Sequence, residues 1–160
     1  MYKNKKVIHI VCMDELGGIG LNNHLLFDIP EDLQHFRNKT LGHACLCGSN
    51  TCKSFPKMLD RRIIRDLSSR FGDNLADGLQ DCWIHSNMLN TKSIYIIGGA
   101  SIYNQTSDIA DELLITIVDA KVEADTFYNI PKGLVKVWES DTQHSVNGLS
   151  FKFTKWEREE

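Results

Sequence analysis

Four short apolar runs, three of them rich in β-branched residues, constrain the fold of this 160-residue chain most strongly. They span residues 7–13, 43–47, 94–97 and 113–118. Runs of this length and composition are typical of strands buried on both faces of a parallel sheet. Segments with helical features separate them, at about residues 30–38, 77–89 and 100–105. The alternation of strand and helix predicts an α/β fold.

The C-terminal part of the chain has a different pattern. Residues 135–138 and 149–154 alternate apolar and polar side chains, which predicts two half-exposed antiparallel strands joined through a turn near Asn147 and Gly148. Residues 61–67 are ambiguous, because Arg65 and Asp66 interrupt an apolar pair. The sequence shows no repeat, low-complexity tract or linker. We therefore expect residues 1–160 to form one domain, a three-layer α/β sandwich whose mostly parallel central sheet ends in an antiparallel C-terminal edge hairpin.

Composition excludes several classes of function. The chain has 18 basic and 21 acidic residues, a formal net charge of −3, so we expect no nucleic-acid partner. No apolar run approaches the roughly 20 residues that a membrane helix needs, and the N-terminus does not resemble a signal peptide. We expect a cytoplasmic monomer that binds a small molecule. The five cysteines (Cys12, Cys45, Cys47, Cys52 and Cys82) include no Cys-x-x-Cys pair, so we expect reduced thiols and no metal site.

Glycines follow two of the predicted strands, at Gly48 and at Gly98-Gly99. Ligands of parallel α/β sheets bind at the carboxyl ends of strands, where helix N-termini attract phosphate groups. Neither junction is a Gly-x-Gly-x-x-Gly fingerprint or a P-loop, so a kinase or nucleoside triphosphatase is disfavoured. A glycine in this place is also common in tight turns, and each signal alone is weak.

Asp32 is the carboxylate that we single out. It lies in the first turn of a predicted helix that begins near Pro30, and it borders the apolar side chains of Leu33 and Phe36. One interpretation is that Asp32 only complements the helix dipole. The other is that it faces a pocket and binds an amidine or guanidine edge through two charge-assisted hydrogen bonds.

Taken in order, these segments resemble the dihydrofolate reductase family from about Val7 to Phe153. The strongest similarity is in residues 19–36, where Ile-Gly, a loop and an aromatic residue precede Pro30-Glu31-Asp32-Leu33 and Phe36. Three further matches are residues 48–51, residues 96–103, and residues 114–116 followed by 123–127. Four ordered motifs are a specific signal, although any one alone is not.

The resemblance implies hydride transfer from NADPH to 7,8-dihydrofolate, which gives 5,6,7,8-tetrahydrofolate, and binding of methotrexate. Asp32 would anchor the amino-pyrimidine edge of the pterin and favour its protonation. Thr116 would hydrogen-bond to Asp32, and Phe27 takes the place of the family's usual Trp. With these three as the catalytic residues, the implied substrate-binding set is Val11, Cys12, Asp32, Leu33, Phe36, Phe55, Arg62 (or Arg61, one position earlier), Ile97 and Thr116.

The resemblance also implies a cofactor site, with the loop of residues 16–24 closing over it. The implied cofactor-binding residues are Cys12, Ile19, Gly20, Asn23, Leu25, Gly48, Ser49, Asn50, Thr51, Ser68, Ser69, Ile97, Gly98, Gly99, Ala100, Ser101, Ile102 and Tyr103. Ser49 stands where the family commonly has the arginine that binds the 2′-phosphate of NADPH, so the choice between NADPH and NADH stays open. Two alternatives also stay open, a pyrimidine reductase of the same fold and a non-catalytic folate- or nucleotide-binding module.

Overall fold

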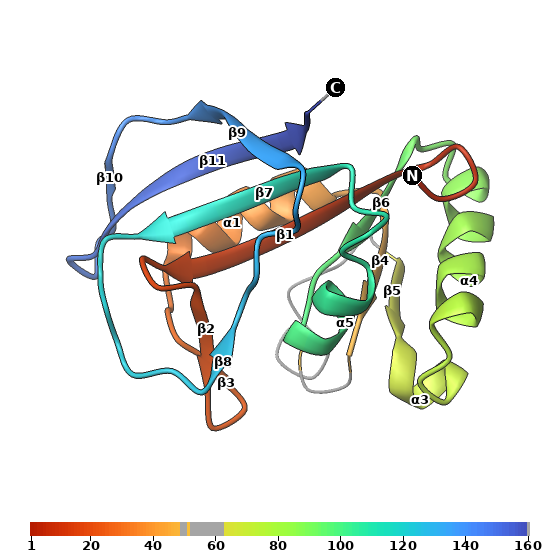
Figure 1. Ribbon diagram of the computed structural model, residues 1–160, viewed down its shortest axis with the longest axis horizontal. Coiled ribbons are helices and arrows are strands. Elements are labelled where there is room, and N and C mark those ends of the chain that lie inside the picture. Colours follow the sequence, from red (N-terminus) through yellow and green to blue (C-terminus); the bar gives the residue numbers. More distant parts are fainter. Residues whose placement is uncertain (49–50, 52–62, 160) are drawn as a thin grey trace.

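Strand β1 lies at the centre of a mixed sheet whose strand order is β10-β11-β7-β1-β6-β4-β5 (Figure 1). The computed structural model describes residues 1–48, 51 and 63–159. The parallel strands are β1 (Lys6–Asp14), β4 (Ala44–Cys47), β5 (Ile63–Asp66), β6 (Ser93–Ile96) and β7 (Glu112–Val118). All four apolar runs are therefore strands, and each pairs in parallel with at least one neighbour, as predicted.

The antiparallel edge is built around strand β11 (Ser150–Arg158). It pairs with β7 on one side, and with β9 (Leu134–Glu139) and β10 (Gln143–His144) on the other. The two predicted strands, β9 and β11, pair with each other. The short β10 lies between them in the chain, and the turn at Asn147 and Gly148 connects β10 to β11. The predicted architecture, a mostly parallel sheet with an antiparallel C-terminal edge, is confirmed.

Alternation along the strands divides the core into two faces. Val7, Val11 and Met13 of β1 pack in one cluster together with residues of α4 (Leu75–Met88) and α5 (Ala100–Gln105). Ile8 and Ile10 pack in a second cluster, which Phe36 of α1 (Pro30–Thr40) covers. Helices thus cover both faces of the sheet, with α1 behind β1 and β7 in Figure 1, and this places the first turn of α1 beside the carboxyl end of β1.

A second, smaller sheet covers the carboxyl end of β1. It consists of β2 (Gly18–Leu21), β3 (His24–Leu25) and β8 (Thr126–Phe127), where the sequence suggested only a glycine-rich loop. The buried Asp14 carboxylate holds the entry to this sheet by accepting hydrogen bonds from the amides of Leu16, Gly18 and Val122. Burial alone would raise the pKa of Asp14, but these three donors outweigh it and lower the pKa.

The ambiguous segment at residues 61–67 contains strand β5 and the beginning of a short helix, α3 (Leu67–Phe71). The half-buried Arg65 is tolerated in β5 because its guanidinium makes two hydrogen bonds to Asp81 of α4, at 2.5 and 3.1 Å. Helix α3 was not predicted, since five residues are too few to show a periodic pattern.

The cysteines only partly follow the prediction. Cys12, Cys45 and Cys82 are reduced thiols, but Cys47 is in a disulfide, so the expectation of five reduced thiols is wrong at that position. Cys52 lies outside the described residues. Within the part of the chain that the structure describes, no helix is long and apolar enough to cross a membrane.

Strand β1 carries a buried histidine. His9 of β1 has no exposed surface, and its two ring nitrogens lie 2.9 Å from the hydroxyl of Tyr128 and 2.7 Å from that of Thr106. Burial lowers the pKa of His9 to about 4. Because its folded pKa is below the unfolded value of about 6.5, the unfolded chain binds more protons between these two pH values.

We therefore expect the free energy of unfolding to fall as the pH is lowered from about 6.5 to 4. Proton linkage between the unfolded and folded pKa values of His9 makes its share of this loss about 3 kcal/mol at pH 4. Denaturant unfolding at several pH values would measure it. His35 has a pKa lowered to about 4 by burial and by Lys39, so a His35→Gln variant is the control. A flat stability profile in that variant would contradict the role of His9.

Candidate active site

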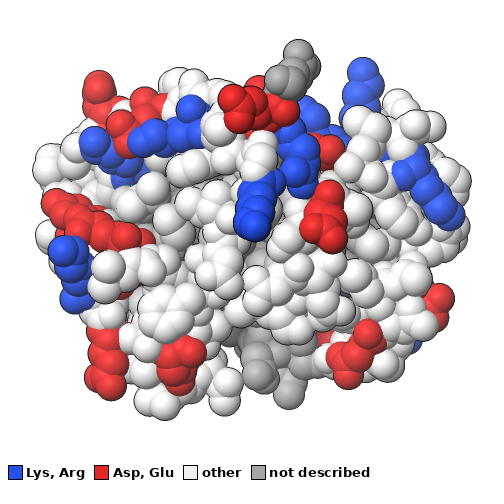
Figure 2. Space-filling view, viewed as in Figure 1, with Lys and Arg blue, Asp and Glu red and all other residues white. Residues whose placement is uncertain are grey.

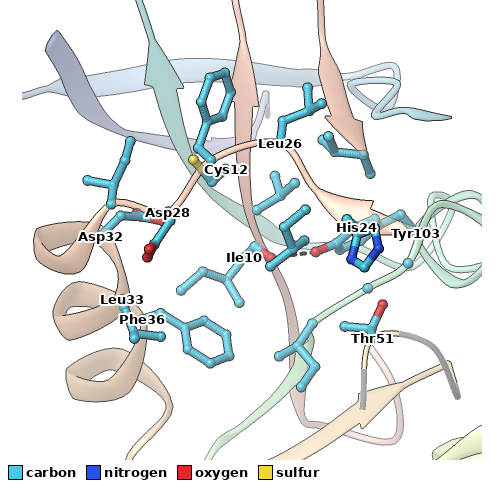
Figure 3. A pocket seen from close by; sticks show the side chains of 18 residues that line it. Ile10, Cys12, His24, Leu26, Asp28, Asp32, Leu33, Phe36, Thr51 and Tyr103 are labelled. Atoms are coloured by element: carbon cyan, nitrogen blue, oxygen red, sulfur yellow. Dashed lines mark hydrogen bonds between the residues drawn. The ribbon is translucent and has the colours of Figure 1, made fainter. Parts of the chain in front are cut away.

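A cavity of about 610 Å³ opens at the carboxyl ends of β1 and β6 (Figure 3). The first two turns of α1 form one wall, and the Gly98-Gly99 junction and Tyr103 form another. Its lining consists of Ile10, Val11, Cys12, Ile19, His24, Leu25, Leu26, Phe27, Asp28, Ile29, Asp32, Leu33, Phe36, Thr51, Ile97, Gly98, Gly99 and Tyr103. A ligand cavity at this edge is the usual arrangement in parallel α/β sheets.

The Asp32 carboxylate is the main polar group on the α1 wall. It is half-buried, and the hydroxyl of Thr116 donates a hydrogen bond to its Oδ1 at 2.5 Å. Cys12 of β1 is the register partner of Thr116 and lines the same cavity as Asp32. Burial raises the pKa of Asp32, and the neighbouring Thr116 hydroxyl and Cys12 thiol oppose the rise. A carboxylate supported in this way can bind a ligand edge that presents two adjacent N–H groups.

Apolar side chains surround the rest of this wall. Leu33 and Phe36 project from α1 into the cavity, and Phe27 and Ile97 line it from other segments. Apolar walls with one carboxylate at the end suit a flat aromatic heterocycle whose polar edge meets Asp32.

A second cavity of about 440 Å³ adjoins the first and shares Ile19, His24, Leu25, Thr51 and Gly99 with it. Its other lining residues are Gly20, Asn23, Gly48, Leu67, Ser68, Asp73, Ala100, Ser101, Ile102, Gln105 and Thr126. Because they share these five residues, the two cavities form one continuous groove.

The Gly98-Gly99 junction separates the two cavities. Gly98 has a φ of +119°, and the peptide bond between the two glycines is cis. A Cβ at Gly98 would lie 3.3 Å from Oγ1 and Cγ2 of Thr51 and from the hydroxyl of Tyr103. That hydroxyl is held in place, because it donates to the carbonyl of Ile10 at 2.6 Å. Only glycine fits this backbone comfortably, and it leaves room for a ligand to approach the main chain.

The structure brings most of the predicted site residues to this groove. Thr116 does not line it but lies behind Asp32 and contacts it. Ser68 lines the second cavity, but its hydroxyl donates to Asp73 at 2.6 Å. Ser69 lies in α3. Ser49, Asn50, Phe55 and both arginines at 61 and 62 lie outside the described residues. All the other predicted residues line one or both cavities.

Several lining residues were not predicted. The polar ones are His24, Asp28, Asp73, Gln105 and Thr126, and the apolar ones are Ile10, Leu26, Ile29 and Leu67. Gln105 could have been found from its spacing, since it lies one helical turn after Ser101 and donates to its hydroxyl at 2.9 Å. Thr126 lies within a matched motif, whereas nothing local in the sequence marks Asp73.

These features define a class, an α/β protein that binds a flat heterocycle beside a nucleotide groove at the carboxyl edge of its sheet. The comparison with protein families agrees with this class. The family described as "Dihydrofolate reductase" matches residues 6–158, and the chain therefore belongs to the dihydrofolate reductase family.

Curated relatives carry the same name. Dihydrofolate reductase of Mycoplasma genitalium is 35% identical over 133 residues, which cover 78% of this chain and 83% of the relative. The enzyme of Mycoplasma pneumoniae is 32% identical, with 76% and 81% covered. That of Staphylococcus aureus is 28% identical, with 81% and 80% covered. The similarity thus extends over most of both chains in each case.

Proposed function

We propose that this chain reduces 7,8-dihydrofolate to 5,6,7,8-tetrahydrofolate with NADPH, as an enzyme of tetrahydrofolate biosynthesis and one-carbon metabolism. The observation that carries the proposal is the Asp32 carboxylate, hydrogen-bonded by Thr116, in a cavity that adjoins the Gly98-Gly99 junction. Family membership over residues 6–158 supports the same reaction.

Asp32 binds the substrate and orients it. Its carboxylate accepts two charge-assisted hydrogen bonds from the amino-pyrimidine edge of the pterin. The same negative charge favours a proton on the neighbouring ring nitrogen, beside the carbon that is reduced. Thr116 fixes the orientation of Asp32, while Leu33 and Phe36 pack against the rings and exclude water.

The residues of the second cavity fit a dinucleotide. Bound NADPH supplies the hydride. Gly98 and Gly99 allow its close approach to the main chain. The first hydrogen bond within α5 runs from the amide of Tyr103 to the carbonyl of Gly99, so the amides before Tyr103 are available to a ligand. Ser101, Gln105 and Thr126 offer side-chain hydrogen-bonding groups along the groove. Leu25 of β3, which lines both cavities, is placed to cover the reacting rings.

We further propose that residues 1–160 act as one domain, as a monomer in the cytoplasm, with a small molecule as the partner. The net charge of −3 supports the absence of a nucleic-acid partner. On the face shown in Figure 2, acidic and basic side chains are interspersed and do not form a patch of one sign. The disulfide at Cys47 is unusual for a cytoplasmic protein, and cell fractionation would test the location.

The decisive experiment mixes purified protein with dihydrofolate and NADPH or NADH and follows the loss of reduced-nicotinamide absorbance. We expect a loss that methotrexate abolishes, and the ratio of the two rates reports the cofactor preference. Methotrexate binding by calorimetry without turnover would instead support a non-catalytic folate-binding module. If the protein showed no turnover and did not bind methotrexate, both folate interpretations would be contradicted and a pyrimidine reductase would be favoured.

A further inference from the structure

Asp14, the last residue of β1, is a buried carboxylate that the proposed reaction does not use. Its side chain is almost fully buried, with 1% of the residue surface exposed. Its Oδ1 accepts hydrogen bonds from the amides of Leu16 at 2.9 Å and Gly18 at 2.8 Å, and its Oδ2 accepts one from the amide of Val122 at 3.1 Å. Bonds of this kind, to an ionised acceptor, are stronger than those between neutral groups.

The three donors belong to two segments that lie far apart in the chain. Leu16 and Gly18 are in the turn and the first residue of β2, whereas Val122 is in the segment that connects β7 to β8. Strands β2 and β8 pair with each other in the small sheet, at the lower left of Figure 1. The Asp14 carboxylate therefore ties both halves of that sheet to the carboxyl end of β1.

The packing at Gly18 shows how closely these segments meet. A Cβ on Gly18 would lie 2.9 Å from the Cβ of Ala124, 3.1 Å from Cδ1 of Leu26 and 3.2 Å from Oδ1 of Asp14. The main chain of β2 can thus reach the carboxylate because residue 18 has no side chain. Leu26 lines the first cavity, so this junction adjoins the groove directly.

The small sheet supplies much of the wall of the second cavity. Six of its residues, including those of the β2–β3 turn, line that cavity: Ile19, Gly20, Asn23, His24, Leu25 and Thr126. The α1 wall of the first cavity has a support of its own, since Thr116 holds Asp32. A displacement of the small sheet should therefore disturb the second cavity more than the surroundings of Asp32.

We propose that Asp14 is a positioning residue for cofactor binding, whose carboxylate fixes the small sheet against the end of β1 so that the second cavity keeps its shape. The proposal rests on the cofactor role proposed above for that cavity. If the dinucleotide binds only the arrangement with the sheet in place, its apparent affinity is proportional to the fraction of molecules in that arrangement. Weakening the Asp14 bonds lowers this fraction and so lowers the affinity.

The test uses Asp14→Asn, which keeps the size of the side chain. An amide group has one acceptor oxygen, and its NH₂ can only donate, so the Asn side chain cannot accept on both sides as the carboxylate does. Glu112→Gln is the matched control, because Glu112 is also a buried carboxylate, but it lies at the amino end of β7, pairs with Lys155 at 3.0 Å and lines neither cavity.

Two binding measurements and one exchange measurement are made at a temperature where each variant is folded. Fluorescence titration gives NADPH affinity without substrate, and calorimetry gives methotrexate affinity. Amide hydrogen exchange by NMR follows Asp125 and Tyr128 in the ligand-free protein, since their amides donate to the carbonyls of Gly20 and Gly17 and so report the joint between the halves of the small sheet.

We expect Asp14→Asn to raise the Kd of NADPH by about fivefold or more, a part of what one hydrogen bond to a charged group can contribute, and to change the Kd of methotrexate by less than about twofold. Exchange at Asp125 and Tyr128 should be about tenfold faster, whereas the amides of β1 and β7 should change much less. Glu112→Gln should leave NADPH affinity and these two amides unchanged, even if it lowers stability as much.

Equal NADPH affinities in Asp14→Asn and Glu112→Gln, or equal losses for NADPH and methotrexate in Asp14→Asn, would overturn the proposal. If Asp14→Asn did not fold, Gly18→Ala would decide, because it keeps the carboxylate and crowds the same junction. It should also weaken NADPH binding more than methotrexate binding, and parent-like NADPH affinity would overturn the proposal. A parent protein that bound no NADPH would refute the proposed function, and the exchange of the two amides would still decide whether Asp14 holds the sheet.

Discussion

Replacing Asp32 with Asn is expected to lower kcat/KM for dihydrofolate by about two to four orders of magnitude at neutral pH, the usual contribution of a group that controls protonation. The amide keeps the size of the side chain and can still accept from Thr116, but it has no charge with which to stabilise a protonated pterin. Stopped-flow or steady-state absorbance of the reduced nicotinamide would measure the loss.

The pH profile separates this role from simple damage to the site. Activity of Asp32→Asn should recover in part at low pH, where the substrate gains a proton from solvent. Glu31→Gln is the matched control, because Glu31 is the next carboxylate on α1 but bonds to Ser145 and Val146 and lines neither cavity. Equal losses in the two variants, or parent-like turnover in Asp32→Asn, would show that Asp32 does not have the proposed role.

Stability should move in the opposite direction from activity. Burial raises the pKa of Asp32 above its unfolded value, so the folded state is penalised for carrying the charge at neutral pH. Asp32→Asn removes this penalty and is expected to leave the free energy of unfolding equal to or above that of the parent. Such a result would mark Asp32 as a residue kept for function at some cost to stability.

The main sheet could be predicted because its signals are local. Four of the five parallel strands are short apolar runs, and the glycines at residues 48, 98 and 99 follow the ends of β4 and β6 closely. The alternation of strands with helices then places the carboxyl edge and its cavity. Asp32 was marked by its place in the first turn of α1, although the resemblance was needed to choose between its two interpretations.

The remainder depends on contacts between residues far apart in the chain. The pairing of β2 with β8 joins segments more than a hundred residues apart, so a glycine-rich loop could not be recognised as a strand. Arg65 is acceptable in β5 only because Asp81 of α4 lies beside it. The hydrogen bond from Thr116 of β7 to Asp32 of α1 likewise joins residues 84 positions apart in the chain.

The second large effect is expected at Gly98. A Gly98→Ala substitution should weaken NADPH binding by about tenfold or more and lower the free energy of unfolding by about 1–3 kcal/mol, the range for a strained backbone position. The cause is twofold, because a φ of +119° disfavours any L side chain and the new methyl would lie 3.3 Å from Thr51 and from the Tyr103 hydroxyl. NADPH fluorescence titration and thermal unfolding would measure the two effects.

Two other glycines separate strain from crowding. Gly148 also has a positive φ, of +84°, but nothing lies within 4 Å of its added Cβ, so Gly148→Ala should lower stability and leave NADPH affinity unchanged. Gly99→Ala places a methyl at 3.4 Å from Thr51 Oγ1 without positive φ, and its stability loss should be smaller than that of Gly98→Ala. If Gly98→Ala bound NADPH as tightly as Gly148→Ala does, the junction would not be part of the cofactor site. A loss of affinity confined to Gly98 and Gly99 would locate the cofactor against the backbone that joins β6 to α5.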